Sequence, residues 1–86
     1  MAYNIEVLPT AKRQLDRLPA DIQRRIAKAV DQLRENPRPV GAIKLTGNGG
    51  LYRVRSGDYR IVYRIEDNRL LVLVVKVGHR REVYRD

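Results

Sequence analysis

The sequence predicts an α+β fold in which an N-terminal helical hairpin packs on one face of a twisted, mainly antiparallel β-sheet. Three observations indicate this class. Residues 51–65 alternate polar and apolar side chains on both sides of Ser56-Gly57-Asp58, residues 70–77 are almost continuously apolar, and residues 11–33 carry apolar side chains at helical spacing. The expected element order is therefore β-α-α-β-β-β.

The first half of the chain is expected to form one strand and two helices. Alternate residues are apolar over residues 3–7, as in a half-buried strand, and Pro9 ends this strand. Thr10 can cap a short amphipathic helix that ends near Pro19, and a second helix follows until residues 36–39, Asn-Pro-Arg-Pro, stop it. Because the connection is short, we expect the two helices to be antiparallel.

The second half is expected to form a sheet with short connections. Residues 42–45 are an extended approach to it, and the glycines of residues 47–50 form a hairpin loop, since they lack the Gly-Lys-Ser/Thr ending of a phosphate-binding loop. Residues 66–69 form the next turn, and residues 70–77 are typical of a strand that is covered on both faces or central in the sheet. From Lys76 onward the chain is too polar for a core.

The central hairpin places four arginines on one surface. Side chains alternate between the two faces of a strand, so Arg53 and Arg55 share a face with Leu51. If the apolar residues of both strands face the core, the arginines on the opposite face are Arg53, Arg55, Arg60 and Arg64. Like charges on neighbouring strands repel, so this cluster is more plausible where an anion binds, and nucleic-acid phosphate is the obvious candidate.

Structural ion pairing is the alternative explanation of the arginine cluster. The acidic residues near it in the sequence are Asp58, Glu66, Asp67 and Glu82. They are too few to pair with every basic residue of the hairpin and of the C-terminal tail. Ion pairing therefore explains only part of this surface.

The composition indicates a polyanionic partner. The chain has 86 residues, a formal charge of +8, and fourteen arginines against four lysines. Arginine binds phosphate through two parallel hydrogen bonds, so nucleic acid or an acidic protein is expected to bind, the alternative being a solubilising surface or attraction to acidic membranes. The sequence has no cysteine, no apolar run long enough for a membrane span and no signal peptide, so we expect a cytoplasmic protein.

Three segments together resemble the RelE/ParE toxin superfamily, and its RelE branch in particular. They are Leu-Tyr-Arg-Val-Arg at residues 51–55, Gly-Asp-Tyr-Arg-Ile-Val-Tyr at residues 57–63 and Val-Gly-His-Arg-Arg-Glu-Val-Tyr at residues 77–84. The resemblance covers residues 1–86 as a single RelE-like toxin domain. It implies the toxin of a type II toxin–antitoxin system, a ribosome-dependent mRNA endoribonuclease that cuts A-site codons by attack of the ribose 2′-OH, with no metal and no cofactor.

The resemblance also implies the partners. An antitoxin encoded by an adjacent gene would mask the basic face, the ribosomal A site and its mRNA would be the target, and operator DNA would be bound only through the antitoxin complex. No membrane partner is implied. Two alternatives are a ParE-like toxin that inhibits DNA gyrase and a catalytically inactive toxin-like binding module.

The same resemblance implies roles for individual residues. Arg53 and Arg55 would hold and neutralise the scissile phosphate, and Arg60 would bridge its oxygens. Arg80 matches a catalytic arginine near the end of the last strand. Tyr84 matches a tyrosine that stacks on the substrate base or handles the 2′-OH proton.

Proton transfer is expected at a residue other than arginine, because the guanidinium pKa lies above about 12. The candidates are Tyr84, His79 and Glu82. The alternatives are that His79 only turns the chain and that Glu82 pairs with a neighbouring arginine. Further RNA contacts are expected from Lys44, Arg64, Lys76 and Arg81.

Overall fold

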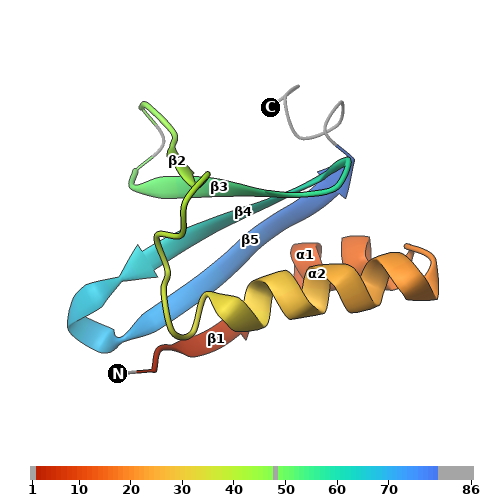
Figure 1. Cartoon of the computed structure of the whole chain (residues 1–86). Helices are drawn as coiled ribbons and strands as arrows, with labels where there is room; N and C mark the ends of the chain where they lie inside the picture. Colours follow the sequence, from red (N-terminus) through yellow and green to blue (C-terminus); the bar gives the residue numbers. More distant parts are fainter. Residues whose placement is uncertain (1, 48, 80–86) are drawn as a thin grey trace.

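A computed structural model describes residues 2–47 and 49–79 of the chain. The elements in chain order are β1 (Asn4–Val7), α1 (Pro9–Asp16), α2 (Ala20–Gln32), β2 (Ile43–Lys44), β3 (Leu51–Ser56), β4 (Tyr59–Glu66), the 3-10 turn η1 (Asp67–Arg69) and β5 (Leu71–His79). Both helices lie on one side of the sheet (Figure 1). The predicted α+β class and element order are confirmed, and the expected extended segment before the hairpin contributes β2 as a two-residue strand.

In the part of the chain described, the strands form one sheet in the order β1-β5-β4-β3-β2. β1 pairs with β5 in parallel, and the other neighbouring strands are antiparallel. β5 is therefore an interior strand, with β1 on one side and β4 on the other, and this position agrees with its almost continuously apolar sequence.

β5 contains one extra residue relative to β4. Val62 lies opposite Lys76, while the next residue of β4, Tyr63, lies opposite Val74. Val75 is thus the extra residue of a β-bulge, and it reverses the alternation of faces along β5. Val74 and Val77 both face the core because of this bulge, and Lys76 does not.

β5 also extends further than the sequence predicts. Leu70 has a left-handed backbone with φ of 47° and belongs to the turn, whereas Val77 and Gly78 are buried within the strand. The prediction that the chain is too polar for the core from Lys76 onward is therefore wrong for Val77 and Gly78, and β5 continues to His79. The pairing of β5 with β4 continues to His79 opposite Tyr59, which keeps this polar stretch in the sheet.

The first helix begins earlier than expected. Leu8 occupies the N-cap position without a side-chain hydrogen bond, and Pro9 is the first helical residue, so Thr10 does not cap this helix. Proline is well suited to this position because its fixed φ matches the helix and its missing N–H has no partner there anyway. No helix among the described residues is long and apolar enough to cross a membrane.

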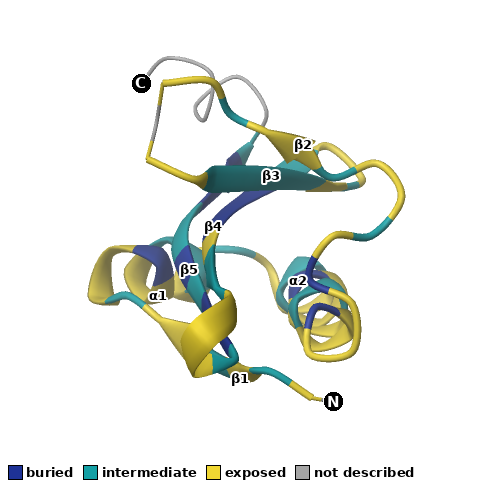
Figure 2. Ribbon diagram, turned by 90° about the vertical axis from the view of Figure 1, so that its left-hand side faces the viewer, coloured by how far each residue is buried: buried dark blue, intermediate teal, exposed yellow. Residues whose placement is uncertain are grey.

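The core lies between the helices and the sheet (Figure 2). Its largest buried side chain is that of Tyr63 on β4, which packs with Ile26 and Leu33 from the α2 region. The Tyr63 hydroxyl donates a hydrogen bond of 2.7 Å to the Pro37 carbonyl oxygen, and burial raises the pKa of Tyr63 to about 12. The predicted inward orientation of the tyrosines of the hairpin is confirmed, since Tyr52 also stacks on Tyr63.

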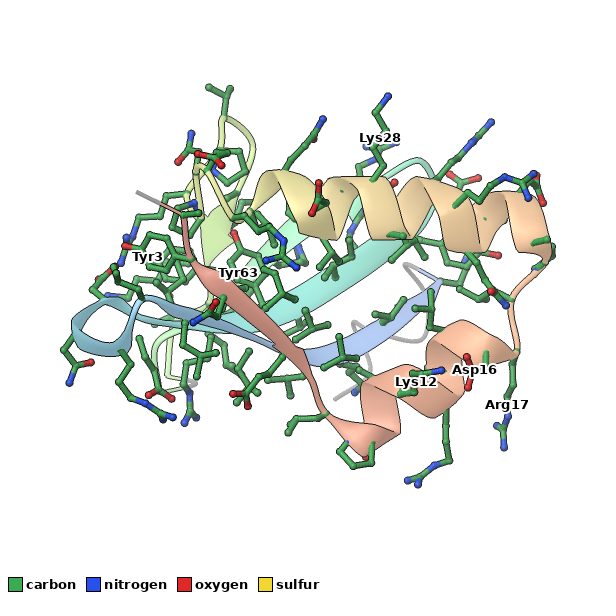
Figure 3. All side chains as sticks on the ribbon, turned by 90° about the horizontal axis from the view of Figure 1, so that it is seen from below. Tyr3, Lys12, Asp16, Arg17, Lys28 and Tyr63 are labelled. Carbon is green, nitrogen blue, oxygen red and sulfur yellow. The ribbon has the colours of Figure 1, made fainter. Side chains whose placement is uncertain are left out.

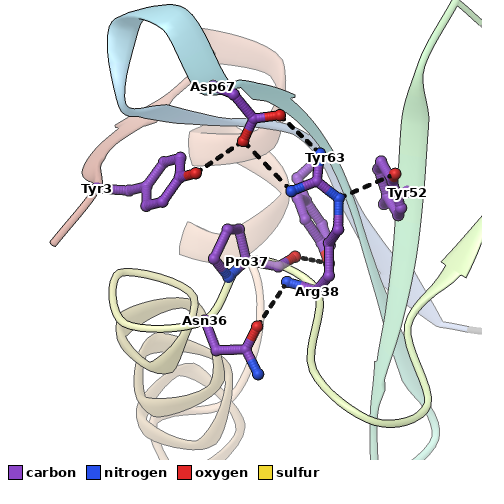
Figure 4. A network of polar contacts seen from close by, with 7 residues as sticks. All are labelled: Tyr3, Asn36, Pro37, Arg38, Tyr52, Tyr63 and Asp67. Atoms are coloured by element: carbon purple, nitrogen blue, oxygen red, sulfur yellow. Dashed lines mark hydrogen bonds and ion pairs between the residues drawn. The ribbon is translucent and has the colours of Figure 1, made fainter. Parts of the chain in front are cut away.

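A polar network closes one end of this core (Figure 4). The Arg38 guanidinium lies 2.8 Å from the Asp67 carboxylate and donates through Nε to the Tyr52 hydroxyl at 3.2 Å. The Tyr3 hydroxyl donates to the same carboxylate at 2.7 Å. The network thus links the residue before β1, the segment after α2, β3 and η1. Its hydrogen bonds, that from Arg38 first, hold the pKa of Asp67 below its usual value.

Candidate functional site

The face of the sheet opposite the helices carries a row of arginines, which we call the arginine surface: Arg53, Arg55, Arg60 and Arg64. The hairpin register brings them together, with Arg55 opposite Arg60. Val62 lies between Arg60 and Arg64 on β4 and opposite Arg53 on β3. This is the common face that strand alternation predicts.

Arg60 is the most buried residue of the arginine surface. Its side chain is only 8% exposed, and its Nε and Nη1 atoms are withdrawn from solvent. On one side it faces Arg55, and on the other it faces Gly78, which has no side chain to cover the guanidinium. A guanidinium held in such surroundings interacts more strongly with an anion than one in bulk water does, because the local dielectric constant is lower.

Two of the acidic residues near the hairpin, Glu66 and Asp67, form ion pairs with other arginines. Glu66 pairs with Arg69 at 2.9 Å, and Asp67 pairs with Arg38 at 2.8 Å. Structural ion pairing by these two acids therefore does not account for the arginine surface. Arg55 instead donates through Nε to the Gly57 carbonyl oxygen at 2.8 Å, which holds its side chain beside the hairpin turn.

The two lysines expected to contact RNA differ in position. Lys76 lies opposite Val62, beside the arginine surface, because the bulge in β5 turns it to that face. Lys44 lies opposite Tyr52, and its neighbour Ile43 lies opposite Arg53. The register of β2 therefore assigns Lys44 to the face of Tyr52, and the structure does not bring it together with the arginine surface.

His79 lies on the helix side of the sheet. It is opposite Tyr59, and the two rings make an edge contact with their centroids 5.7 Å apart. Gly78, not His79, shares the face of Arg60, so the described structure does not bring the imidazole together with the arginine surface. Four of the predicted site residues lie outside the described part of the chain, and their roles remain predictions: Arg80, Arg81, Glu82 and Tyr84.

The site includes one residue that sequence reasoning missed, which is Gly78. Gly78 is buried and lies directly opposite Arg60 on the neighbouring strand. The sequence does show a glycine between Val77 and His79. However, strict alternation of side chains along β5 would place Gly78 on the core face of the sheet. Only the extra residue at Val75 reverses that assignment.

Comparison with known proteins agrees with this geometry. The family model described as "ParE toxin of type II toxin-antitoxin system, parDE" matches residues 5–84. Toxin RelG of Mycobacterium tuberculosis is 34% identical over 86 residues, covering 99% of each protein. The mRNA interferase toxin RelE of Escherichia coli K12 is 32% identical, covering all of this chain and 94% of that one. The toxin–antitoxin complex RelBE2 of M. tuberculosis superposes with a TM-score of 0.83 at 28% identity, covering 92% of this chain and 99% of that one.

The fold, with its two helices on one face of a mixed sheet, and the match over most of the chain define the class of protein. The chain belongs to the RelE/ParE superfamily of toxins from type II toxin–antitoxin systems. Within that superfamily it is a RelE-like toxin, as the names of its relatives and structural neighbours indicate.

Proposed function

We propose that this toxin is a ribosome-dependent mRNA endoribonuclease that cleaves codons in the ribosomal A site. The observation that carries the proposal is the arginine surface, where a nearly buried Arg60 lies among exposed or half-buried guanidiniums on one face of the sheet. The similarity to an mRNA interferase toxin over the whole chain supports the same substrate class.

The proposed chemistry is attack of a ribose 2′-oxygen on the adjacent phosphorus. The phosphorus–O5′ bond breaks, leaving a 2′,3′-cyclic phosphate and a 5′-OH. The negative charge that develops on the phosphorane oxygens is stabilised by Arg60 together with Arg53 and Arg55. Removing one well-placed donor of this kind typically costs a factor of about 10² to 10³ in rate.

The two proton transfers need groups of another kind, because arginine stays protonated. The 2′-OH proton must go to a base, and the leaving O5′ must receive a proton. Tyr84 and Glu82 are the candidates from the C-terminal segment. His79 is the weaker candidate, since its ring packs against Tyr59 on the other face of the sheet.

The proposed partners follow from the charge and the family. A chain of charge +8 suits the phosphate-rich A site and its mRNA. In the cytoplasm, a cognate antitoxin encoded by an adjacent gene inhibits the toxin. Operator DNA is bound only by the toxin–antitoxin complex, through the antitoxin. The RelBE2 structure is a precedent for a toxin of this fold bound to an antitoxin.

Primer extension on mRNA under translation tests the activity. We expect cuts at codon-related positions that require ribosomes, and a loss of about 100-fold or more in both Arg60→Ala and Arg60→Lys. Arg69→Ala is the matched control, because Arg69 pairs with Glu66 in η1 and is remote in register from Arg60. Thermal melts establish that each variant is folded. Undiminished cleavage by folded Arg60→Ala would refute the mechanism.

A second candidate is inhibition of DNA gyrase, as in the ParE branch. The observation in its favour is that the matching family model is that of ParE toxins. A gyrase supercoiling assay with the purified toxin distinguishes the two. Inhibition of supercoiling without mRNA cleavage would favour this candidate, and binding of antitoxin with neither activity would favour an inactive toxin-like binding module.

A further inference from the structure

β5 contributes a lysine, Lys76, to the face of the sheet that carries the arginine surface. Val62 of β4 lies opposite Arg53 on β3 and opposite Lys76 on β5, so these three residues form one row across the sheet. The extra residue at Val75 turns Lys76 to this face. Without it, strict alternation from the buried Val74 would bring Lys76 to the core side.

Lys76 is also a diagonal neighbour of Arg60. Gly78 lies directly opposite Arg60, and Lys76 precedes Gly78 by two residues on the same strand. Diagonal neighbours on adjacent antiparallel strands lie about 7–8 Å apart, a separation that long side chains can span. Since Gly78 has no side chain, Lys76 is the described residue of β5 whose side chain is nearest in register to Arg60 on this face. A phosphate bound by Arg60 is therefore within reach of the Lys76 ammonium group.

A lysine ammonium group can do what the guanidinium groups around it cannot. Arginine stays protonated in proteins, so the arginine surface can bind and neutralise phosphate without exchanging a proton. A lysine ammonium group carries a proton at neutral pH and is a far stronger acid than an alcohol. It can therefore give this proton to an oxygen that is leaving as an alkoxide.

Other described titratable groups near this face are less suited to donate a proton. Glu66 follows Arg64 by two residues on β4 and pairs with Arg69 at 2.9 Å, so it is held as a carboxylate without a proton to give. His79 packs against the Tyr59 ring on the other face of the sheet. Among the described residues of this face, Lys76 combines attraction for phosphate with a proton that can be transferred.

We propose that Lys76 is a catalytic residue, the general acid that protonates the leaving O5′. The inference rests on the proposed function and assigns one of its two proton transfers. As the 2′-oxygen attacks phosphorus, the phosphorus–O5′ bond breaks and its electron pair takes a proton from the Lys76 ammonium group. The products are the 5′-OH and a neutral amine, which regains a proton from water. The 2′-OH proton goes to a separate base, for which Tyr84 and Glu82 are the candidates.

A change of the leaving atom separates proton donation from attraction of phosphate. If Lys76 only attracts phosphate, its contribution to the rate is the same whichever atom leaves. If Lys76 donates a proton, its contribution disappears when sulfur replaces O5′. A thiolate is a stable anion near neutral pH and leaves without a proton, whereas an alkoxide does not.

The test uses ribosomes programmed with synthetic mRNA in which the scissile O5′ is either kept or replaced by sulfur, at the cut position that primer extension maps with wild-type toxin. With the oxygen mRNA and saturating toxin, Lys76→Arg and Lys76→Met should cleave at least about 100-fold more slowly than wild type, a usual size for a general-acid effect. With the sulfur mRNA both should recover most of this loss, and Lys76→Arg should cleave within about threefold of wild type. Arg60→Lys should stay slow with both mRNAs, because the phosphorane charge develops in either case.

Lys28 provides the matched control. It is an exposed lysine of α2, on the helix side of the sheet, and its side chain points away from the sheet (Figure 3). Lys28→Arg and Lys28→Met make the same changes of side chain and net charge as the two Lys76 variants. They should cleave both mRNAs within about twofold of wild type, because salt screens charges that are far from the site. Thermal melts establish that each variant is folded.

Two results would overturn the proposal while the proposed function stands. One is cleavage of the oxygen mRNA by folded Lys76→Arg at the wild-type rate. The other is an equal loss with the oxygen and sulfur mRNAs, which would show that Lys76 acts only through its charge or its packing. If wild-type toxin cleaves neither mRNA, the proposed function fails, and the role of Lys76 fails with it.

Discussion

Arg55 on β3 and Arg60 on β4 lie directly opposite each other across the hairpin, one position from its turn. Directly opposite residues have their Cβ atoms about 5 Å apart, and like charges at that distance destabilise a sheet. Arg60 adds the cost of burying most of a guanidinium. Both effects lower the stability of the fold, and an anion bound beside the two side chains would offset them.

The first prediction concerns this repulsion. Arg55→Thr should stabilise the fold by about 0.2–1 kcal/mol at low salt, and the gain should shrink at high salt because salt screens the repulsion. Cleavage activity should fall in the same variant. Arg53→Thr is the control, since Arg53 lies on the same strand but opposite Val62. Urea denaturation at two salt concentrations measures the effect, and equal changes for the two variants would contradict it.

The second prediction concerns the buried hydroxyl of Tyr63. Tyr63→Phe leaves the Pro37 carbonyl oxygen without this partner and should destabilise the fold by about 1–2 kcal/mol. Tyr59→Phe is the matched control, because the Tyr59 hydroxyl makes no hydrogen bond to a described residue and should lose little. Chemical denaturation gives both values. A loss in Tyr59→Phe as large as that in Tyr63→Phe would show that the hydroxyl bond is unimportant.

The third prediction gives a pH dependence to the network around Asp67. The pKa of this carboxyl group is lowered by hydrogen bonds from Arg38 first and Tyr3 second. A carboxyl group whose pKa is lower in the folded state stabilises the fold above its unfolded pKa, about 3.9, and this stabilisation is lost as the pH falls towards the folded value. Wild type should therefore melt at a higher temperature than Asp67→Asn at pH 7, with the difference disappearing below about pH 4. A difference independent of pH would argue against the charged pair.

The fourth prediction concerns the turn of the central hairpin. Gly57 has φ of 60°, a conformation that costs an ordinary L-residue about 1–2 kcal/mol. Gly57→Ala should destabilise the fold by about that amount, although the added Cβ would meet nothing closer than the Arg25 side chain at 3.9 Å. Gly57→Asn should lose less, since asparagine tolerates this region better. Thermal melts distinguish the backbone effect from crowding, which would penalise asparagine more than alanine.

Local patterns predicted the central part of this molecule correctly. The alternation of residues 51–65 and the short Gly-containing turn determine which side chains share a face, so Arg53, Arg55, Arg60 and Arg64 could be grouped from the sequence. The same alternation assigned Tyr52, Tyr59 and Tyr63 to the core side. These relationships depend on neighbours in sequence, and local rules are sufficient for them.

Local sequence patterns could not predict the pairing of distant strands or the position of the β-bulge. Nothing near Asn4 indicates that it pairs with Leu71, and nothing near Val75 marks it as the extra residue that reverses the faces of β5. The faces of His79 and Lys44 depend on the registers of β5 and β2, each of which is set by a partner strand. A one-residue change of register moves a side chain to the other side of a sheet, so these positions required the structure.

The interior position of β5, the last of the described strands in the chain, determines when the sheet can be completed during synthesis. A growing chain that has reached only Leu70 already contains Arg53, Arg55 and Arg60, but β1 still lacks the strand with which it pairs and β4 lacks one of its two neighbours. Contacts that join distant parts of a chain form late, because closing the intervening loop costs entropy. The sheet that carries the arginine surface is therefore completed only after β5 has been translated.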